Sequence, residues 1–259
     1  MMPPVRALFY LLTVAALVVS ARAVMGEPPS IAFVAIFTTS YLAVLLSGVF
    51  VLRLRVFVDA MIHGPKGARG VALTFDDGPD PESTTKTLDA LDAAGAKATF
   101  FVIGMKAEAH PETVREILER GHQVALHSYA HDRLFALRGA RTWKKDLKKG
   151  ARVLEEITGT KPKLFRPPIG HTVPHTPRVV RELGLRVIGW DVSARDGIRA
   201  DPKDVARRVL EGAHDGAIVL LHDASERGTH APAGVAALPE ILEGLKKKGL
   251  AVVALSEWM

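Results

Sequence analysis

The chain has 259 residues, of which 48% are hydrophobic, and a formal net charge of +6. This length is sufficient for one domain with a full hydrophobic core. The absence of cysteine excludes a disulfide framework, a thiolate metal site and a cysteine nucleophile. No basic patch interleaved with aromatic residues points to nucleic acid as a partner, and nothing in the pattern indicates an oligomeric state.

Two apolar segments open the chain. Residues 31–52 are 22 residues without a charge, long enough to cross a bilayer as a helix. They lack the polar face of a soluble core helix, so we predict a transmembrane helix. The earlier segment, 7–21, has 15 uncharged residues. It predicts either a second span over about residues 5–25, with Arg22 reaching the interface, or a signal peptide cleaved after Ala23.

Basic residues beside these segments predict their orientation. Arg6 precedes the first segment, and Arg53 and Arg55 follow the second. The positive-inside rule places both outer ends in the cytoplasm, as a hairpin joined by a linker at 27–30. We therefore predict a membrane anchor and linker over residues 1–67, with the following domain at the cytoplasmic face. In the alternative, the second segment is a signal anchor and the domain lies outside the cytoplasm.

From about residue 68 short apolar runs alternate with amphipathic stretches. The strand candidates are 71–74, 98–102, 123–127, 163–165, 185–190, 217–221 and 250–255. The helix candidates between them are 84–94, 111–120, 143–157, 177–183, 202–210 and 238–248. This alternation predicts an α/β domain with a parallel sheet and helical crossovers. About seven units without a GxGxxG after the first strand favour a distorted (β/α) barrel over residues 68–259, preceded by one or two transmembrane helices.

Two adjacent acids, Asp76 and Asp77, follow the first strand candidate and precede a Gly-Pro turn. A strand end lies at the mouth of a site in such a barrel, and the bend of the chain lets both acids share one pocket. Two carboxylates that close raise each other's pKa unless a cation or an arginine intervenes. Alone, the motif is more typical of a solvated turn, so a functional interpretation requires a cation from elsewhere.

The segment HSYAH closes the third strand candidate and supplies two histidines. His127 and His131 are four residues apart, and on a helical turn such a pair points the same way and can bind one metal ion. A single histidine is more often a hydrogen-bonded structural residue, but this pair with an aspartate forms a His-His-Asp set. Three protein ligands leave a fourth position for water, as in catalytic zinc sites.

Three further strand candidates end in polar motifs. In RPPIG, Arg166 can pair with an acid of the site, and two prolines leave the N–H of Ile169 free to point inward. In WDVSARDG, Asp196 follows a strand, although acids there often only cap the next helix. In LLHD, His222 has the position of a catalytic group, although a structural role also explains a histidine there.

Together these motifs resemble the polysaccharide deacetylase family, also called the NodB homology domain or carbohydrate esterase family 4. Its five motifs occur here in the family's order: TFDDGP, HSYAH, RPPIG, WDVSARD and LLHD. The resemblance covers roughly residues 68–258, and the first two motifs are quite specific.

The resemblance implies a role for each matching residue. Asp77, His127 and His131 are expected to bind a divalent metal, Zn²⁺ above all, with Co²⁺, Ni²⁺ or Mn²⁺ as alternatives. Asp76 is expected to be the general base, held by Arg166. The remaining roles are those of the general acid His222, its partner Asp196, the oxyanion donor Ile169 N–H, and Leu220, which lines the pocket for the acetyl methyl group.

Two positions depart from the family pattern. The family usually has tyrosine where this chain has Ile169, and tryptophan where it has Gly197. A sugar contact and one wall of the usual groove are therefore missing. This weakens the expectation of chitin or peptidoglycan as the substrate, but not that of the chemistry.

We therefore predict a metal-dependent hydrolase that removes N-acetyl groups from an amino-sugar-containing saccharide, polymeric or lipid-linked, and releases acetate. One alternative is a deformylase of a lipid-linked amino sugar. Another is a non-catalytic, membrane-tethered saccharide-binding protein. The presence of every residue expected to bind the metal or transfer a proton argues against the latter.

Overall fold

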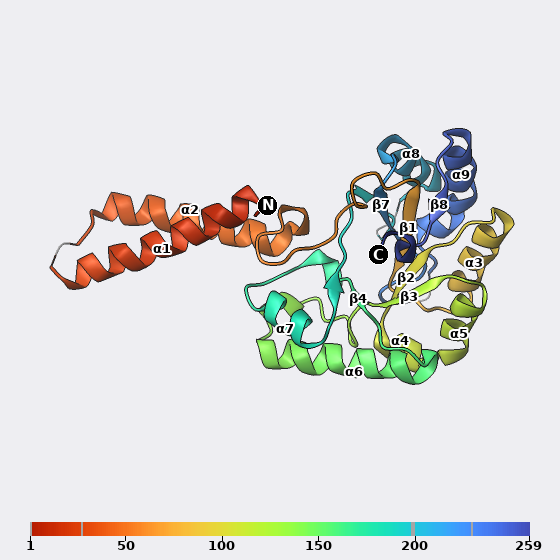
Figure 1. Ribbon diagram of the computed structural model, residues 1–259, viewed down its shortest axis with the longest axis horizontal. Helices are drawn as coiled ribbons and strands as arrows, with labels where there is room; N and C mark the ends of the chain where they lie inside the picture. Colours follow the sequence, from red (N-terminus) through yellow and green to blue (C-terminus); the bar gives the residue numbers. More distant parts are fainter. Residues whose placement is uncertain (1, 27, 198–199, 229) are drawn as a thin grey trace.

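The computed structural model describes residues 2–26, 28–197, 200–228 and 230–259. A long helical hairpin projects from an α/β domain, and the two helices of the hairpin meet at the end farthest from that domain (Figure 1). The N-terminal end of the first helix therefore lies at the domain end of the hairpin (Figure 1).

The hairpin consists of α1 (Pro4–Val24) and α2 (Ile31–Phe50). Proline in the first turn starts α1, and the Ser30 hydroxyl caps α2 by accepting the N–H of Phe33 at 3.3 Å. The side chains of both helices are largely exposed. Both are long and apolar enough to cross a membrane, a test that a signal sequence also passes. Glu27 of the predicted linker lies outside the described residues.

The described part of the domain is built on a sheet of eight strands. Seven run parallel in the order β5-β4-β3-β2-β1-β7-β6, and β8 also pairs in parallel, with the start of β1. The strands are β1 (Val71–Asp76), β2 (Thr99–Val102), β3 (Gln123–Leu126), β4 (Leu164–Phe165), β5 (Arg186–Val187), β6 (Val192–Ser193), β7 (Ala217–His222) and β8 (Val252–Val253). The sheet curls into a half-barrel, which confirms the predicted distorted (β/α) barrel.

Helices cover the sheet between successive strands (Figure 1). They are α3 (Ser83–Ala93), α4 (Gly104–Ala109), α5 (Pro111–Glu119), α6 (Ala140–Thr158), α7 (Thr176–Glu182), α8 (Pro202–Gly212) and α9 (Ala233–Lys247). In α6, Trp143, Leu147 and Leu154 recur on one face and are buried, while the lysines between them are exposed. The lysine-rich run is thus the solvated face of an amphipathic helix.

Several elements differ from the sequence prediction. The candidate at 185–190 forms only the short β5, followed by an isolated parallel bridge between Ile188 and Met61, in which the Gly189 N–H donates to the carbonyl of Met61 at 2.8 Å. The short helix α4 and the two-residue strand β6 were not predicted, since both lie in segments too short for a periodic pattern.

Residues 52–63 join the hairpin to the domain and pack into its core. Leu52, Phe57 and Met61 are buried, and Met61 forms a parallel bridge with Ile188. The assignment of residues 1–67 to an anchor and 68–259 to the domain stays a prediction, and these contacts place the end of that first segment against the domain core.

The topology brings the motifs to one edge. β1 lies centrally between β2 and β7, and parallel strands present their carboxyl ends on the same side of the sheet. Asp76 at the end of β1 is the direct register partner of His222 at the end of β7. The two residues expected to transfer protons are thereby neighbours.

Candidate active site

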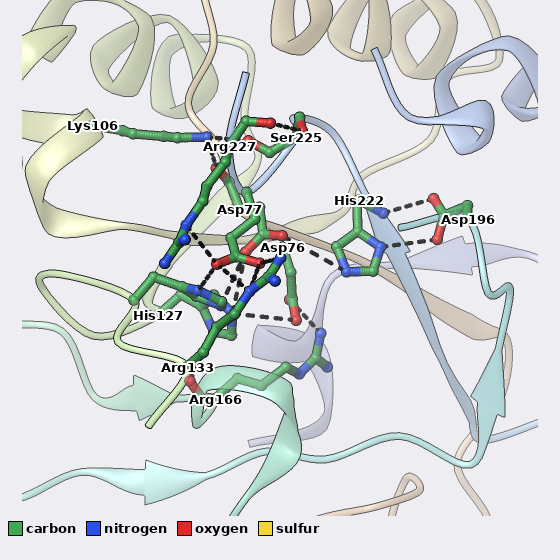
Figure 2. Close-up of polar contacts among 12 residues, drawn as sticks. Asp76, Asp77, Lys106, His127, Arg133, Arg166, Asp196, His222, Ser225 and Arg227 are labelled. Atoms are coloured by element: carbon green, nitrogen blue, oxygen red, sulfur yellow. Dashed lines mark hydrogen bonds and ion pairs between the residues drawn. The ribbon is translucent and has the colours of Figure 1, made fainter. Parts of the chain in front are cut away.

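The loops that follow β1, β3, β4 and β7 surround one pocket of about 350 Å³. Figure 2 shows the polar side chains of this region directed toward one another. The lining residues are Asp76, Asp77, His127, His131, Arg133, Ile169, Gly170, Trp190, Gly197, Leu220, His222, Ser225, Glu226, Arg227 and His230. Arg166 and Asp196 lie directly behind this surface, bonded to Asp76 and His222 respectively.

Asp76 is held by Arg166 through a buried charged hydrogen bond. The guanidinium Nη1 donates to Asp76 Oδ1 at 2.7 Å, and Nη2 donates to the carbonyl of Gly189 at 3.0 Å. Arg166 is fully buried with its guanidinium over the ring of Phe101. This charged pair keeps one carboxylate oxygen of Asp76 occupied and fixes the direction of the other.

Asp77, His127 and His131 form a buried cluster whose potential ligand atoms lie within 4.8 Å of one another. Nε2 of His127 is 3.5 Å and Nε2 of His131 is 3.4 Å from Asp77 Oδ1. The structure thus brings together the three residues expected to bind a metal.

The two histidines converge, but not on a helical turn as their spacing predicted. Residues 127–131 are irregular, with Ser128 at φ 63° and His131 at φ 47°. The Ser128 hydroxyl accepts the N–H of His131 at 3.0 Å and thereby closes a tight loop. The two imidazoles are therefore brought together by a loop that a side-chain hydrogen bond closes, and not by the periodicity of a helix.

These residues fit a divalent cation. Asp77 Oδ1 is buried and has no hydrogen-bond donor among the described residues, and an unpaired buried carboxylate oxygen is costly unless a cation is present. Nδ1–H of His127 donates to the carbonyl of Arg166 at 2.8 Å, which leaves Nε2 with its lone pair toward the cluster. Burial lowers the pKa of His127 and so favours the neutral, metal-binding form.

His222 is paired with Asp196 twice. Its Nδ1 is 2.9 Å from Asp196 Oδ1, and its backbone N–H donates to Oδ2 at 2.9 Å. Burial by itself lowers the pKa of His222, but the hydrogen bond and charge of Asp196 outweigh burial and raise the pKa to about 9. Nε2 points to the acidic cluster, 3.9 Å from Asp77 Oδ2. The imidazole is thus held as a proton donor at the pocket.

The two predicted substrate contacts line the pocket. Ile169 has φ 57°, and its side chain is 50% exposed at the rim. Its N–H donates to no backbone carbonyl of the described residues. Leu220 is buried on β7 and closes the floor. Gly197 lies against His222, because a Cβ built there would be 3.0 Å from Cε1 of the imidazole.

Three residues of this region, Glu226, Arg133 and Lys106, were missed by the sequence analysis. Oε1 of Glu226 lies 3.2 Å from Nδ1 of His131, off the line of an ideal hydrogen bond, and Arg133 bonds the same carboxylate through Nε and Nη2 at 2.8 and 2.6 Å. Lys106 Nζ donates to the carbonyls of Asp77 and Ser225 at 2.7 and 2.6 Å. These residues lie outside the recognised motifs, and no local pattern signals them.

Comparisons with known proteins agree with this geometry. The family profile described as polysaccharide deacetylase matches residues 63–188. A peptidoglycan-N-acetylglucosamine deacetylase of Bacillus cereus is 36% identical over 194 residues, which cover 74% of this chain and 69% of that protein. A chitooligosaccharide deacetylase of a Bradyrhizobium species is 32% identical over 194 residues, covering 72% of this chain and 89% of that protein.

A solved structure has the same fold. It is a peptidoglycan N-acetylglucosamine deacetylase in complex with a naphthyl-substituted N-hydroxybenzamide, 33% identical, with a TM-score of 0.72 over 77% of this chain and 92% of that one. The fold, the pocket and the relatives all agree, so the chain belongs to the polysaccharide deacetylase family and is a carbohydrate deacetylase.

Proposed function

We propose that this protein is a metal-dependent N-deacetylase of an amino-sugar-containing saccharide, which hydrolyses the acetamide and releases acetate. The observation that carries the proposal is the arrangement around one pocket of three components. They are the Asp77-His127-His131 cluster, the Asp76-Arg166 pair and the His222-Asp196 pair. These three components provide what the hydrolysis of an amide requires: a site for a cation that activates water, a base and an acid that protonates the leaving group.

Asp77, His127 and His131 would hold the divalent cation, and their two nitrogens and one oxygen suit Zn²⁺ best. When bound, the cation supplies Lewis acidity: it lowers the pKa of a water ligand and polarises the acetamide carbonyl. Co²⁺, Ni²⁺ and Mn²⁺ are alternatives with the same donor set.

The side chains around the cluster divide the proton transfers. Asp76 accepts a proton from the attacking water on the oxygen that Arg166 leaves free. The Ile169 N–H donates to the carbonyl oxygen as it gains negative charge. His222 donates its Nε2 proton to the departing sugar nitrogen, and Asp196 stabilises the imidazolium until then.

The substrate is proposed to be an N-acetylated saccharide, polymeric or lipid-linked. Two relatives are named as deacetylases of peptidoglycan N-acetylglucosamine and of chitooligosaccharides. Leu220 offers the apolar floor that an acetyl methyl group requires. Ile169 and Gly197 leave the rim open where the family pattern has aromatic side chains, which favours a substrate that differs from the family's usual polymers.

We further propose that α1 and α2 anchor the protein in a membrane and that α1 is retained. Nη2 of Arg6 forms an ion pair with Asp59 at 2.8 Å and bonds to the carbonyl of Arg55 at 2.6 Å. The ring of Phe9 packs edge-on against Phe57 at 5.4 Å. Removal of the first helix as a signal peptide would break these contacts with the domain. The flanking arginines favour the cytoplasmic face for the domain.

The test is an assay of acetate release by the full-length protein in detergent, after loading with Zn²⁺ or Co²⁺. Chitooligosaccharides and N-acetylglucosamine carried on a prenyl phosphate serve as substrates. Metal-dependent acetate release supports the proposal. Release of formate from the N-formyl analogue alone would identify a deformylase, and saccharide binding without release from any of them would identify a binding protein.

A further inference from the structure

A second groove lies beside the active-site pocket. It is lined on one side by the C-terminal end of α2 and the turn that follows it, and on the other by the rim of the active site. The lining residues are Phe50, Val51, Leu52, Arg53, Ile169, Gly170, Trp190, Asp191 and Ser193. Ile169, Gly170 and Trp190 line both cavities, so the groove adjoins the active-site pocket along these residues.

The end of α2 is attached to this rim by direct bonds. The Thr172 hydroxyl donates to the carbonyl of Gly48, and the Thr172 N–H donates to that of Val49, both at 3.2 Å. These bonds satisfy carbonyls that the last turn of a helix leaves without partners. Phe50 packs edge-on against His171 at 5.0 Å. The RPPIG loop is therefore joined to the helix end.

This attachment determines where the active site lies if α2 crosses a bilayer. The C-terminal end of the helix is then at the membrane–water interface, and the rim residue Ile169 lies within the same groove. Phe50 and Val51 are 58% and 44% exposed and form an apolar wall on the side of the helix. A substrate whose sugar reaches the pocket therefore has apolar protein and lipid immediately beside it.

Among the described residues that line the groove, Arg53 is the cation available to a ligand. Arg53 is exposed and forms no ion pair or hydrogen bond with another described residue. The one acid of the groove, Asp191, is already engaged: Oδ1 accepts the N–H of Ile218 at 2.9 Å, and Oδ2 is 3.2 Å from Nε2 of His214. A free cation next to an apolar wall matches a phosphate that joins a sugar to a lipid.

We infer that this groove holds the lipid-phosphate end of a lipid-linked N-acetylated amino sugar, with Arg53 facing the phosphate and the sugar in the active-site pocket. The inference rests on the proposed function and names its substrate class. The lipid extends along Phe50 toward the bilayer, so the hairpin serves as part of the substrate-binding surface as well as an anchor.

The experiment compares two substrates that present the same sugar. Full-length protein in nanodiscs of zwitterionic lipid, loaded with Zn²⁺, receives either prenyl-phosphate-linked N-acetylglucosamine or the water-soluble N-acetylglucosamine trimer, and kcat/KM for acetate release is measured. Loss of one charged contact with the phosphate corresponds to about a tenfold decrease. We expect Arg53→Ala to lower kcat/KM about tenfold for the lipid-linked substrate only. Arg53→Lys should recover most of the loss.

Arg152→Ala is the matched control, because Arg152 is an exposed arginine on α6 that forms an ion pair with Glu156 at 3.1 Å and with no other described residue. It should change neither rate. An equal effect of Arg53→Ala on both substrates, or none on the lipid-linked one, overturns the inference. So does an effect that appears only in nanodiscs with anionic phospholipid, since Arg53 then binds a lipid headgroup.

The same measurements separate the deacetylase activity from the binding of a lipid phosphate in the groove. If the wild-type protein deacetylates the trimer but not the lipid-linked sugar, the proposed function stands and the groove inference is overturned. If it releases acetate from neither, the proposed function itself is wrong.

Discussion

At the residue scale, the site separates groups that would bind metal from groups that would move protons. Asp77, His127 and His131 lie close enough to share one ion, whereas His222 is turned toward Asp196. Changes to the two sets should therefore have different effects on metal content, although both lower turnover.

We expect Asp77→Ala and His131→Ala to lose both the bound metal and the activity, because either change leaves two protein ligands. His222→Ala should retain the metal and lose about 10²–10⁴-fold in kcat, the usual contribution of a general acid. Metal content of the purified variants, measured with acetate release, separates the cases. Stoichiometric metal in both Asp77→Ala and His131→Ala would remove the ligand assignment, and loss of metal from His222→Ala would make that residue a ligand.

The pH dependence of the reaction should report on Asp196. This carboxylate helps to raise the pKa of His222 to about 9 against the effect of burial. A general acid works below its pKa, so activity should fall as the pH rises through that value. Asp196→Asn removes the negative charge, lowers the pKa of His222 and should move the basic limb of the pH profile of kcat/KM to lower pH, with metal content unchanged. If the basic limb does not move, it reports the titration of a group other than His222.

Glu226 should tighten metal binding without touching the metal. Burial raises the pKa of its carboxyl, but Arg133 and His131 outweigh burial and lower the pKa, so a carboxylate faces His131. Carboxylates behind ligand histidines typically account for about 10–100-fold in metal affinity. We expect Glu226→Gln to lower the affinity of the site for Zn²⁺ by that factor, as measured in a chelator competition assay.

The matched control is Glu108→Gln, because Glu108 accepts a hydrogen bond from the Tyr129 hydroxyl at 2.7 Å, whereas none of the described hydrogen bonds or ion pairs joins it to Asp77, His127 or His131. Equal Zn²⁺ affinity in the wild type and Glu226→Gln would show that Glu226 only pairs with Arg133.

At the element scale, the site is built from strand ends and from the strained loops that follow them. Non-glycine residues at positive φ occur in four of the motif loops: Asp77, Ser128, His131, Ile169 and Arg195. Each left-handed residue costs on the order of 1 kcal/mol or more, and persists only where its surroundings impose it. The core strands supply that support, since β1 is buried at every position.

Lys106 from α4 joins the loop after β1 to the loop after β7. We expect Lys106→Met, which keeps the apolar stem, to leave the carbonyls of Asp77 and Ser225 without their donor and to cost roughly 1–3 kcal/mol of stability. For a domain of this size that corresponds to a fall in Tm of a few degrees, at about 2–4 °C per kcal/mol. Thermal unfolding and kcat of the full-length protein provide the measurement.

Lys86→Met is the control for this change, because Lys86 forms an exposed pair with Glu82 at 2.6 Å and such pairs contribute about 0–1 kcal/mol. If both variants unfold at the wild-type temperature, the link between the loops does not stabilise the domain.

At the scale of the whole molecule, the hairpin and the domain form one continuous structure. Arg6 at the start of α1 and Thr172 beside the active site both bond to the segment where the hairpin meets the domain. The start of α1 and the domain must then lie on the same side of any membrane that the hairpin crosses.

We expect that side to be the cytoplasm, because Arg6, Arg53 and Arg55 flank the helices at the domain end. A fluorescent protein fused after Met259 should therefore fluoresce, and alkaline phosphatase at the same position should be inactive. The reverse pair of results would place the domain outside and restore cell-wall or secreted polysaccharide as the leading substrate.

The sequence by itself determined the fold class, the two apolar helices and the motif residues that gather around one pocket. These features are local. Apolar runs mark strands, and the motif residues follow those runs within a few positions, so parallel topology alone predicts that Asp76, His127, Arg166 and His222 meet at one edge. Element boundaries were less accurate. The helix predicted to start at residue 238 begins at Ala233, because the chain accommodates Pro239 inside the helix.

Only the tertiary structure decided how those residues are held and what lies beside them. Glu226 reaches His131, and Lys106 reaches Asp77 and Ser225, across more than 25 positions of sequence in each case. The end of α2 adjoins Ile169 through Thr172. Such contacts depend on the packing of elements distant in sequence, and no local periodicity or turn signal encodes which loop meets which.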